Sequence, residues 1–192
     1  MLSKIIAETR SYRMFWQAES IDIATRKELV DLARLGGSAR NVQPLKYLLV
    51  NSPSQNTKIF SQLGWAGYLK DWPGPVEGER PSAYIICMLD TRLSNTAECD
   101  LGIGTQNVLL GATEKGLGGC RIASFSRELE SILNIPDYLQ ILMVLALGKP
   151  KEKVLSEDSG PDGDIKYWRD ASHVHHVPKR SLAEIVMVGP VD

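Results

Sequence analysis

Residues 100–120 constrain the fold more than any other stretch of the chain. Apolar residues recur here at helical spacing, the positions between them are mostly small, and only Glu114 and Lys115 add charge after Asp100. Since a helix that faces solvent carries a charged stripe, this pattern predicts a helix buried on most sides, deep in a core or in a subunit interface. The glycines within 116–119 predict a left-handed cap and a tight turn, after which an apolar strand starts at Cys120.

Other periodic segments supply the remaining elements. A helix is predicted over residues 3–9, and a second begins at a capping box formed by Thr25 and Glu28. That second helix stops at Gly36 and Gly37. Its buried face is Leu29, Leu32 and Ala33. A short helix is predicted within 126–136, and apolar runs predict strands at 47–50, 83–89 and 139–147.

The later part of the chain is more polar. Residues 151–163 are charged and contain glycine, which predicts a loop. His173, His175 and His176 follow, but no Cys, Asp or Glu completes a metal-ligand spacing. We therefore expect no metal site and a surface hairpin, in which His173 and His175 share one face of a strand.

Size and charge exclude several classes of protein. The 192 residues suffice for one domain, 1–192, and a net charge of −1 gives no support to a nucleic-acid or membrane-surface role. No stretch approaches the ~20 apolar residues of a membrane-spanning helix, and the N-terminus does not have the pattern of a signal peptide. Three cysteines without metal-ligand spacing suggest reduced thiols, so the expected location is the cytoplasm.

Two polar segments are candidates for ligand binding, each with a plainer alternative. Arg10 and Arg13 flank Ser11, which fits a phosphate or an anionic ring, or only a solvated basic patch. The loop 38–44 carries serine, asparagine and glutamine, which suit the edge of a planar heterocycle or merely satisfy nearby backbone groups.

Two further segments extend the candidate list. Lys179 and Arg180 precede a helix start marked by the capping box of Ser181 and Glu184, which is a plausible phosphate seat with Lys149 as a third cation. Proline and glycine break regular structure between residues 63 and 81. This segment is either a plain surface connection or a source of stacking side chains, the candidates being Trp65, Tyr68 and Trp72.

Several motifs in order resemble the nitroreductase family of flavin enzymes. They are Arg10-Ser11-x-Arg13, Ser38-x-x-Asn41-x-Gln43-Pro44, the Gly-Leu-Gly-Gly-Cys turn after the long helix, and Leu147-Gly148-Lys149-Pro150. The match is collinear from about residue 9 to residue 187. Membership implies an α+β fold with a central mixed sheet flanked by helices. It also implies a homodimer with a buried interface helix and FMN in two clefts at the interface.

The resemblance also assigns roles to individual residues. It places Arg10, Ser11 and Arg13 at the phosphate, ribityl chain and pyrimidine edge of FMN. A flavin-contacting loop, whose serine end reaches the partner's cofactor, would comprise Ser38, Ala39, Asn41 and Gln43. The strand beside the reactive edge of the ring would supply Ile122, Ala123 and Ser124. The phosphate would be bound by Lys179 and Arg180, with Lys149 less directly involved.

The expected reaction is ping-pong hydride transfer from NADH or NADPH through FMN to a nitroaromatic, quinone or similar small acceptor. No side-chain nucleophile or general base is needed, so we expect no separate catalytic residue. The dinucleotide motif G-x-G-x-x-G is not found between a strand and a helix, so the nicotinamide is expected to be a substrate. The alternatives are a flavin store or sensor without turnover, a specialised relative such as a dehalogenase, or a structural dimer without cofactor.

Overall fold

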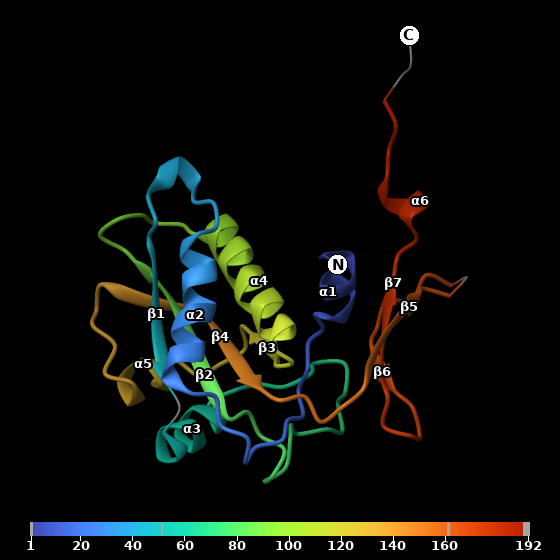
Figure 1. Cartoon of the computed structure of the whole chain (residues 1–192), viewed down its shortest axis with the longest axis horizontal. Helices are drawn as coiled ribbons and strands as arrows, with labels where there is room; N and C mark the ends of the chain where they lie inside the picture. The colour runs from blue at the N-terminus through green and yellow to red at the C-terminus, as the bar shows by residue number, and fades with distance from the viewer. Residues whose placement is uncertain (1, 51, 161, 190–192) are drawn as a thin grey trace.

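The computed structural model describes residues 2–50, 52–160 and 162–189 (Figure 1). The helices are α1 (Leu2–Glu8), α2 (Ile23–Arg34), α3 (Pro53–Phe60), α4 (Glu98–Glu114), α5 (Glu128–Ile132) and α6 (Leu182–Ile185). The strands are β1 (Leu45–Val50), β2 (Ala83–Asp90), β3 (Gly118–Ile122), β4 (Leu139–Gly148), β5 (Val154–Asp158), β6 (Trp168–Arg169) and β7 (His175–Lys179). A short 3-10 turn, η1 (Ala39–Asn41), lies between α2 and β1. Among the described residues, no helix has both the length and the apolar character needed to cross a membrane.

Four strands form the central sheet in the order β1-β2-β4-β3, and every neighbouring pair is antiparallel. The prediction of a mixed sheet is therefore wrong for these strands. β2 and β3 run in the same direction, with α4 connecting them, but β4 inserts between them and separates the parallel pair. All eight residues of β2 are buried, as its continuous apolar run predicted.

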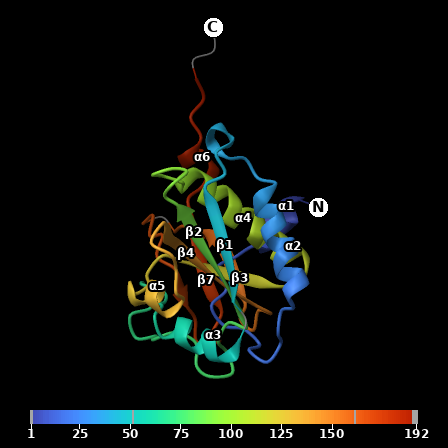
Figure 2. The same ribbon diagram turned by 90° about the vertical axis from the view of Figure 1, so that its left-hand side faces the viewer.

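The two faces of the central sheet are covered by different helices (Figure 2). Helices α2 and α4 pack on one face, where Leu29 and Val108 join a buried cluster with strand residues. On the other face, Leu129 of α5 packs with Val144 of β4. Burying one such aliphatic side chain contributes about 1.5–3 kcal/mol, so these two layers hold the sheet in place.

Helix α4 is only partly covered by the residues that the structure describes. Gly104, Val108 and Ala112 are buried, whereas Gly102 and Ile103 are exposed. The prediction of a helix buried on most sides therefore holds only for the face toward the sheet and α2.

The turn after α4 has the predicted left-handed glycine. Gly116 has φ +71°, a conformation that residues with a Cβ rarely adopt. The strand that follows starts at Gly118, two residues earlier than predicted. Gly119 leaves no room for a side chain, because a Cβ there would stand 2.7 Å from Leu109 and 2.8 Å from the carbonyl oxygen of Ala146.

Two local predictions about helix starts have different outcomes. The N-cap of α2 is Asp22, whose carboxylate accepts a hydrogen bond from the N–H of Thr25 at 2.7 Å, so the prediction that Thr25 caps this helix is wrong. Asp22 competes successfully because it sits three residues before that N–H group. The capping box of Ser181 and Glu184 at α6 is confirmed.

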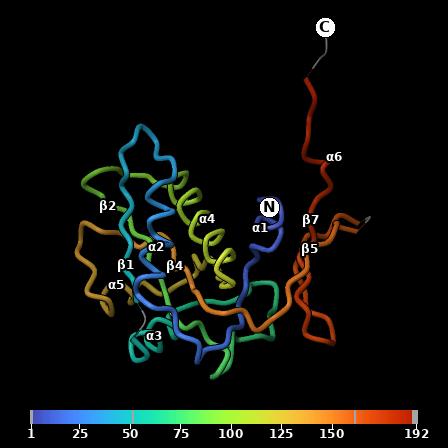
Figure 3. The backbone as a smooth tube through the Cα atoms, in the orientation of Figure 1, coloured from blue at the N-terminus to red at the C-terminus, as the bar shows by residue number. Residues whose placement is uncertain are grey.

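The second sheet has the order β5-β7-β6 and lies on the far side of α1 from the central sheet (Figure 3). β5 and β7 are parallel, whereas β6 and β7 are antiparallel. The prediction of a loop over residues 151–163 is wrong at β5. The strand forms because β7 supplies a hydrogen-bonding partner about twenty residues later, which the polar sequence of β5 does not reveal.

Candidate functional site

A cavity of about 190 Å³ lies where β3 ends, and it gathers several of the predicted site residues. They are Arg13, Trp65, Ile122, Ala123 and Ser124. Ile122 is buried, whereas Ala123 and Ser124 are exposed as the chain leaves the strand. The N–H of Gly64 donates to the carbonyl of Ser124 at 2.8 Å, so the loop after α3 packs on the strand end and forms one wall. We call this space the Arg13 cavity.

Arg13 is the buried cation of the Arg13 cavity. Its Nη1 donates to the carbonyl of Ser11 at 3.2 Å and lies 3.1 Å from Nε2 of His175. Its guanidinium also lies over the ring of Tyr167, 4.8 Å from the ring centre. These contacts fix the Arg13 side chain through its Nη1 atom and through the face of its guanidinium that packs on Tyr167. The other guanidinium nitrogens form no hydrogen bond within residues 2–50, 52–160 and 162–189, and they remain available as donors to a ligand.

His175 holds Arg13 from the C-terminal sheet. The side chain is fully buried, and this burial, with the positive charges of Arg13 and Arg169, lowers the pKa of His175 to about 4. Because arginine can only donate, Nε2 of the neutral ring accepts and its proton is on Nδ1. Nδ1 is buried and has no partner in the part of the chain that the structure describes.

The prediction of a surface hairpin for the three histidines is wrong for His175. His173 lies in the turn before β7 with φ +61°, so it does not share a strand face with His175. The parallel pairing of β7 with β5 fixes the position of His175. The ring of His176 instead stacks on Trp168 at 4.1 Å, and a hydrogen bond to Glu157 raises the pKa of His176.

Glu152 clamps the N-terminal segment to the C-terminal sheet. Its carboxylate accepts hydrogen bonds from the backbone N–H of Arg13 and, at 3.0 Å, from that of Met14. The other carboxylate oxygen accepts from Nη2 of Arg169 at 2.8 Å. The Glu152 side chain is completely buried, so these partners replace the hydrogen bonds that water would otherwise provide. Sequence reasoning missed Glu152, because its partners lie far away in the sequence and nothing local indicates burial.

The predicted aromatic residues form a group beside the Arg13 cavity. Trp65 meets Trp72 edge to face, with ring centres 6.5 Å apart, and the guanidinium of Arg169 lies 4.3 Å from the ring of Trp72. The hydroxyl of Tyr167 accepts from the N–H of Tyr68 at 3.3 Å, and their rings are 4.8 Å apart. Tyr167 lines the cavity but was not predicted; its only signal is the polar, aromatic composition of its segment.

Arg10 and Ser11 lie next to this cavity but do not line it. Ser11 forms a parallel bridge with Gly119 at the edge of β3. Arg10 donates to Oγ of Ser156 at 2.9 Å and to the carbonyl of Ile6 at 2.8 Å. Nε of Arg10 is buried without a partner among the described residues, so this nitrogen can still donate to a bound group.

Lys179 is the C-terminal cation on the face of the second sheet that Arg10 contacts. It ends β7 two residues after Val177, and Val177 pairs with Ser156, the residue that Arg10 contacts. Residues two apart on a strand point to the same face, so the side chains of Arg10 and Lys179 lie at the same face of the second sheet.

Lys149 and Arg180 are not brought into the cavity. Nζ of Lys149 lies 3.0 Å from Glu19, and Nη1 of Arg180 lies 2.7 Å from Glu184 in the first turn of α6. All four side chains are about half exposed, so these ion pairs are weak and exchangeable.

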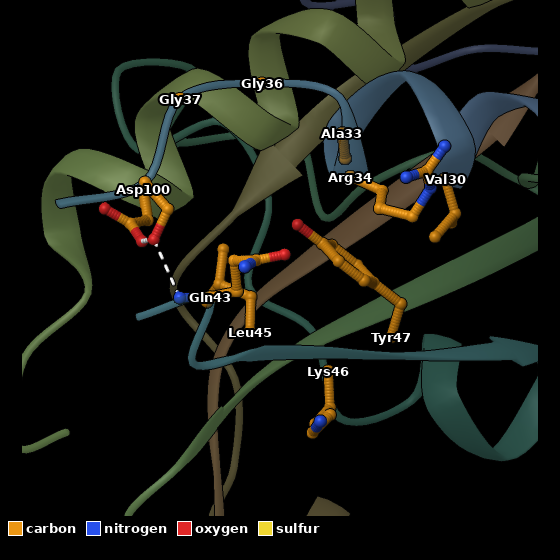
Figure 4. Close-up of a pocket in the computed structure, with 11 residues that line it drawn as sticks. Val30, Ala33, Arg34, Gly36, Gly37, Gln43, Leu45, Lys46, Tyr47 and Asp100 are labelled. Carbon is orange, nitrogen blue, oxygen red and sulfur yellow. Dashed lines mark hydrogen bonds between the residues drawn. The ribbon is translucent and has the colours of Figure 1, made fainter. Parts of the chain in front are cut away.

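The loop between α2 and β1 contributes to a different cavity, of about 480 Å³, which we call the Ser38 cavity (Figure 4). Oγ of Ser38 donates to the buried carboxylate of Asp100 and accepts from the N–H of Gln43 at 2.8 Å. The N–H of Ala39 also donates to Asp100, at 3.0 Å. The Ser38 cavity and the Arg13 cavity share no lining residue, so this chain holds the two predicted halves of the site apart.

The backbone of this loop is strained. Arg40, Asn41 and Gln43 have φ values of 50°, 56° and 53°, in the left-handed region that residues with a Cβ seldom occupy. Each such residue costs on the order of 1–3 kcal/mol and persists where the surroundings impose it. Here the hydrogen bonds of Ser38 to Asp100 and Gln43 impose the conformation, and they leave the side chain of Asn41 exposed.

The central part of the chain matches a known family. Residues 82–149, from the residue before β2 to the residue after β4, match the sequence model described as the nitroreductase family. A protein from Archaeoglobus fulgidus named NADH dehydrogenase/NAD(P)H nitroreductase is 26% identical over 159 residues. That alignment covers 78% of this chain and 86% of the relative.

Solved structures share the fold. A nitroreductase family protein from Clostridium novyi superposes with a TM-score of 0.64 at 20% identity, covering 96% of this chain and 98% of that one. The NADPH:FMN oxidoreductase of Vibrio harveyi, solved with NAD⁺, superposes with a TM-score of 0.63 at 21% identity, covering 79% of this chain and 69% of that one. The family match across the central sheet, the Archaeoglobus relative and the common fold agree, and the chain is similar to proteins of the nitroreductase family.

Proposed function

We propose that this protein is an FMN-dependent oxidoreductase that takes hydride from NADH or NADPH and reduces small acceptors such as nitroaromatics or quinones. The observation that carries the proposal is the state of Arg13: a buried guanidinium held by His175, with unused donors in a cavity beside the end of β3. The flavin ring carries carbonyl and nitrogen acceptors that such donors suit. The names of the Archaeoglobus and Vibrio proteins support the same chemistry.

The polar groups of the chain fit FMN at both of its ends. Ala123 and Ser124 are exposed, line the Arg13 cavity and have small side chains, so a planar ring can approach their backbone N–H groups closely. At the other end, the unpartnered Nε of Arg10 and the nearby Lys179 would bind the phosphate. Arg180 would join them by releasing Glu184, its exposed partner.

The bound cofactor would supply reversible two-electron transfer, and the side chains would supply binding and orientation. The positive charge of Arg13 would stabilise negative charge on the pyrimidine side of the ring. Trp65, Tyr68 and Trp72 would stack on the aromatic donor and on the acceptor. Because donor and acceptor would use the same face in turn, the kinetics would be ping-pong.

We also propose that the working form is a homodimer. The Arg13 cavity of about 190 Å³ is smaller than the roughly 300–1,000 Å³ usual for drug-sized ligands, so it would hold only part of FMN. The Ser38–Gln43 loop of a second copy would supply the rest. Apolar side chains next to α4 are exposed in the single chain, among them Leu35 at 65% and Ile103 at 37%. A partner subunit would cover this face.

Steady-state kinetics of the FMN-loaded protein test the proposed function. NADH or NADPH oxidation is measured at several concentrations of menadione and of a nitroaromatic. The expected result is parallel double-reciprocal lines, with activity strongly reduced in Arg13→Ala and retained in Arg127→Ala, an exposed arginine outside the cavity. If bound flavin is reduced by neither nucleotide, or is not reoxidised by either acceptor, the protein stores flavin and the proposal is wrong.

A further inference from the structure

A third cavity, of about 560 Å³, lies between α3, the start of β2 and the N-terminal segment before α2. We call it the α3 cavity. Its lining includes Asn56 and Phe60 of α3, Arg80 and Ser82 of the segment before β2, and Tyr84 of β2. None of its lining residues belongs to the Arg13 cavity or the Ser38 cavity, so the proposed redox function leaves it unexplained.

Unpaired polar atoms concentrate at the α3 cavity. Four of its lining residues each have a buried polar atom without a hydrogen-bond partner in the described part of the chain: Oδ1 of Asn56, Nε of Arg80, Oγ of Ser82 and the hydroxyl of Tyr84. Tyr84 is fully buried, and burial raises its pKa, so its hydroxyl remains protonated. Because buried polar groups are nearly always paired, four unpaired ones around one cavity indicate a missing partner.

The chemistry of these four atoms restricts that partner. Nε of Arg80 can only donate, whereas Oδ1 of Asn56 can only accept, since Nδ2 of the same amide donates to the carbonyl of Ser82 at 2.8 Å. The hydroxyls of Ser82 and Tyr84 can do either. The partner must therefore accept from Arg80 and also donate to Asn56.

The hydrogen-bonding roles disfavour ionic partners. A carboxylate cannot donate to Asn56, and any anion would face Glu77, which lines the cavity and has a carboxylate oxygen 2.6 Å from Nη1 of Arg80. An ammonium group cannot accept from Arg80. An uncharged group that both donates and accepts matches the roles of these atoms.

We propose that the α3 cavity binds a small uncharged molecule through neighbouring atoms that both donate and accept hydrogen bonds, as a vicinal diol or a primary carboxamide does. The volume lies within the roughly 300–1,000 Å³ of small-molecule sites. Phe60 separates this ligand from the Arg13 cavity, because its ring lies 4.3 Å from the guanidinium of Arg80 and 5.7 Å from the ring of Trp65. The site is independent of flavin binding, so its test does not depend on the proposed function.

The test is calorimetric titration of the purified full chain with five probes. Adenosine carries a vicinal diol, 2′-deoxyadenosine lacks it, nicotinamide carries a carboxamide, and benzoate and benzylamine carry charges. If the site recognises a vicinal diol, adenosine should bind saturably and 2′-deoxyadenosine should not. If it recognises a carboxamide, nicotinamide should bind saturably. This binding should weaken at least tenfold in Tyr84→Phe and in Ser82→Ala, and persist in Arg13→Ala. Binding of no uncharged probe, equal binding of the charged probes, or unchanged binding to Tyr84→Phe would each overturn the proposal.

The melting temperature of the ligand-free variant gives an independent test. Tyr84→Phe keeps the ring and removes only a hydroxyl without a partner, so it should melt at or above the temperature of the parent protein. Tyr138→Phe, at a partly exposed tyrosine on the loop before β4, is the matched control. A lower melting temperature for Tyr84→Phe alone would show that the hydroxyl already has a partner such as ordered water, and the ligand site would be rejected.

Discussion

Nη1 of Arg13 lies 3.1 Å from Nε2 of His175, which joins the N-terminal basic motif to a strand more than 160 residues later. The contact requires a neutral His175. The pKa of this histidine is lowered to about 4, so its ring is neutral at neutral pH. The position of Arg13 therefore depends on the second sheet, and so would any ligand bound in the Arg13 cavity.

Replacing Arg13 by alanine should weaken FMN binding. The loss of charge-assisted hydrogen bonds, at about 1.5–3 kcal/mol, corresponds to roughly a 10- to 100-fold higher dissociation constant. Fluorescence titration of the flavin-free protein measures it, with Arg127→Ala as the control at an exposed site. Unchanged affinity in a folded Arg13→Ala variant would remove Arg13 from the cofactor site.

Glu152→Gln should destabilise the fold strongly. The substitution leaves Arg169 without its buried carboxylate and weakens the acceptor for the N–H groups of Arg13 and Met14. Breaking a buried ion pair in this way costs about 3–5 kcal/mol, measurable by urea unfolding. Glu28→Gln removes a carboxylate from the surface pair with Lys115 and should leave stability almost unchanged. Equal effects of the two variants would contradict the clamp.

The sequence predicts the parts of this fold that local patterns encode. The central strands are long apolar runs, and the glycine turn after α4 follows from a residue that must adopt a left-handed conformation. β5 is different, since it is polar and exists because β7 pairs with it. The antiparallel neighbours of the central sheet likewise depend on where β4 inserts, and no local pattern specifies that.

The residues of the candidate site likewise fall into those that the sequence predicts and those that it does not. Arg13 and the strand end at Ile122 belong to short motifs and were predicted, and the structure brings them to one cavity. Glu152, Tyr167 and His175 were missed, because each gains its role through a contact that is distant in sequence.

The stability of the protein should decrease as the pH falls from about 6.5 to 4. His175 takes up a proton near pH 6.5 in the unfolded chain but only near pH 4 in the folded one, so acid favours unfolding between these values. His175→Gln should reduce the slope of the free energy of unfolding against pH. The reduction is at most about 1.4 kcal/mol per pH unit, the value for the uptake of one proton. Urea unfolding at several pH values measures the slope.

His176 is the control for this pH dependence. His176 should act in the opposite sense, because its pKa is raised and its stabilising effect fades as the pH increases. A slope in His175→Gln identical to that of the parent protein would show that His175 is not the titrating group.

Ile103→Glu should dissociate the proposed dimer. Ile103 is exposed on the face of α4 that the chain leaves uncovered, and a charge there would be buried against the partner. Sedimentation velocity should show a monomer with reduced flavin content and unchanged circular dichroism. Val76→Glu, at an apolar residue 61% exposed in the loop before β2, should remain dimeric. A monomeric parent protein that binds FMN fully would contradict the two-subunit site.

Hydride transfer through bound FMN is tested most simply by an anaerobic absorbance spectrum of the purified protein with FMN, before and after NADH or NADPH. We expect a bound yellow flavin whose visible absorbance is bleached by at least one nucleotide and returns when a quinone is added. A protein that binds no FMN on reconstitution, or whose bound flavin neither nucleotide bleaches, would contradict it.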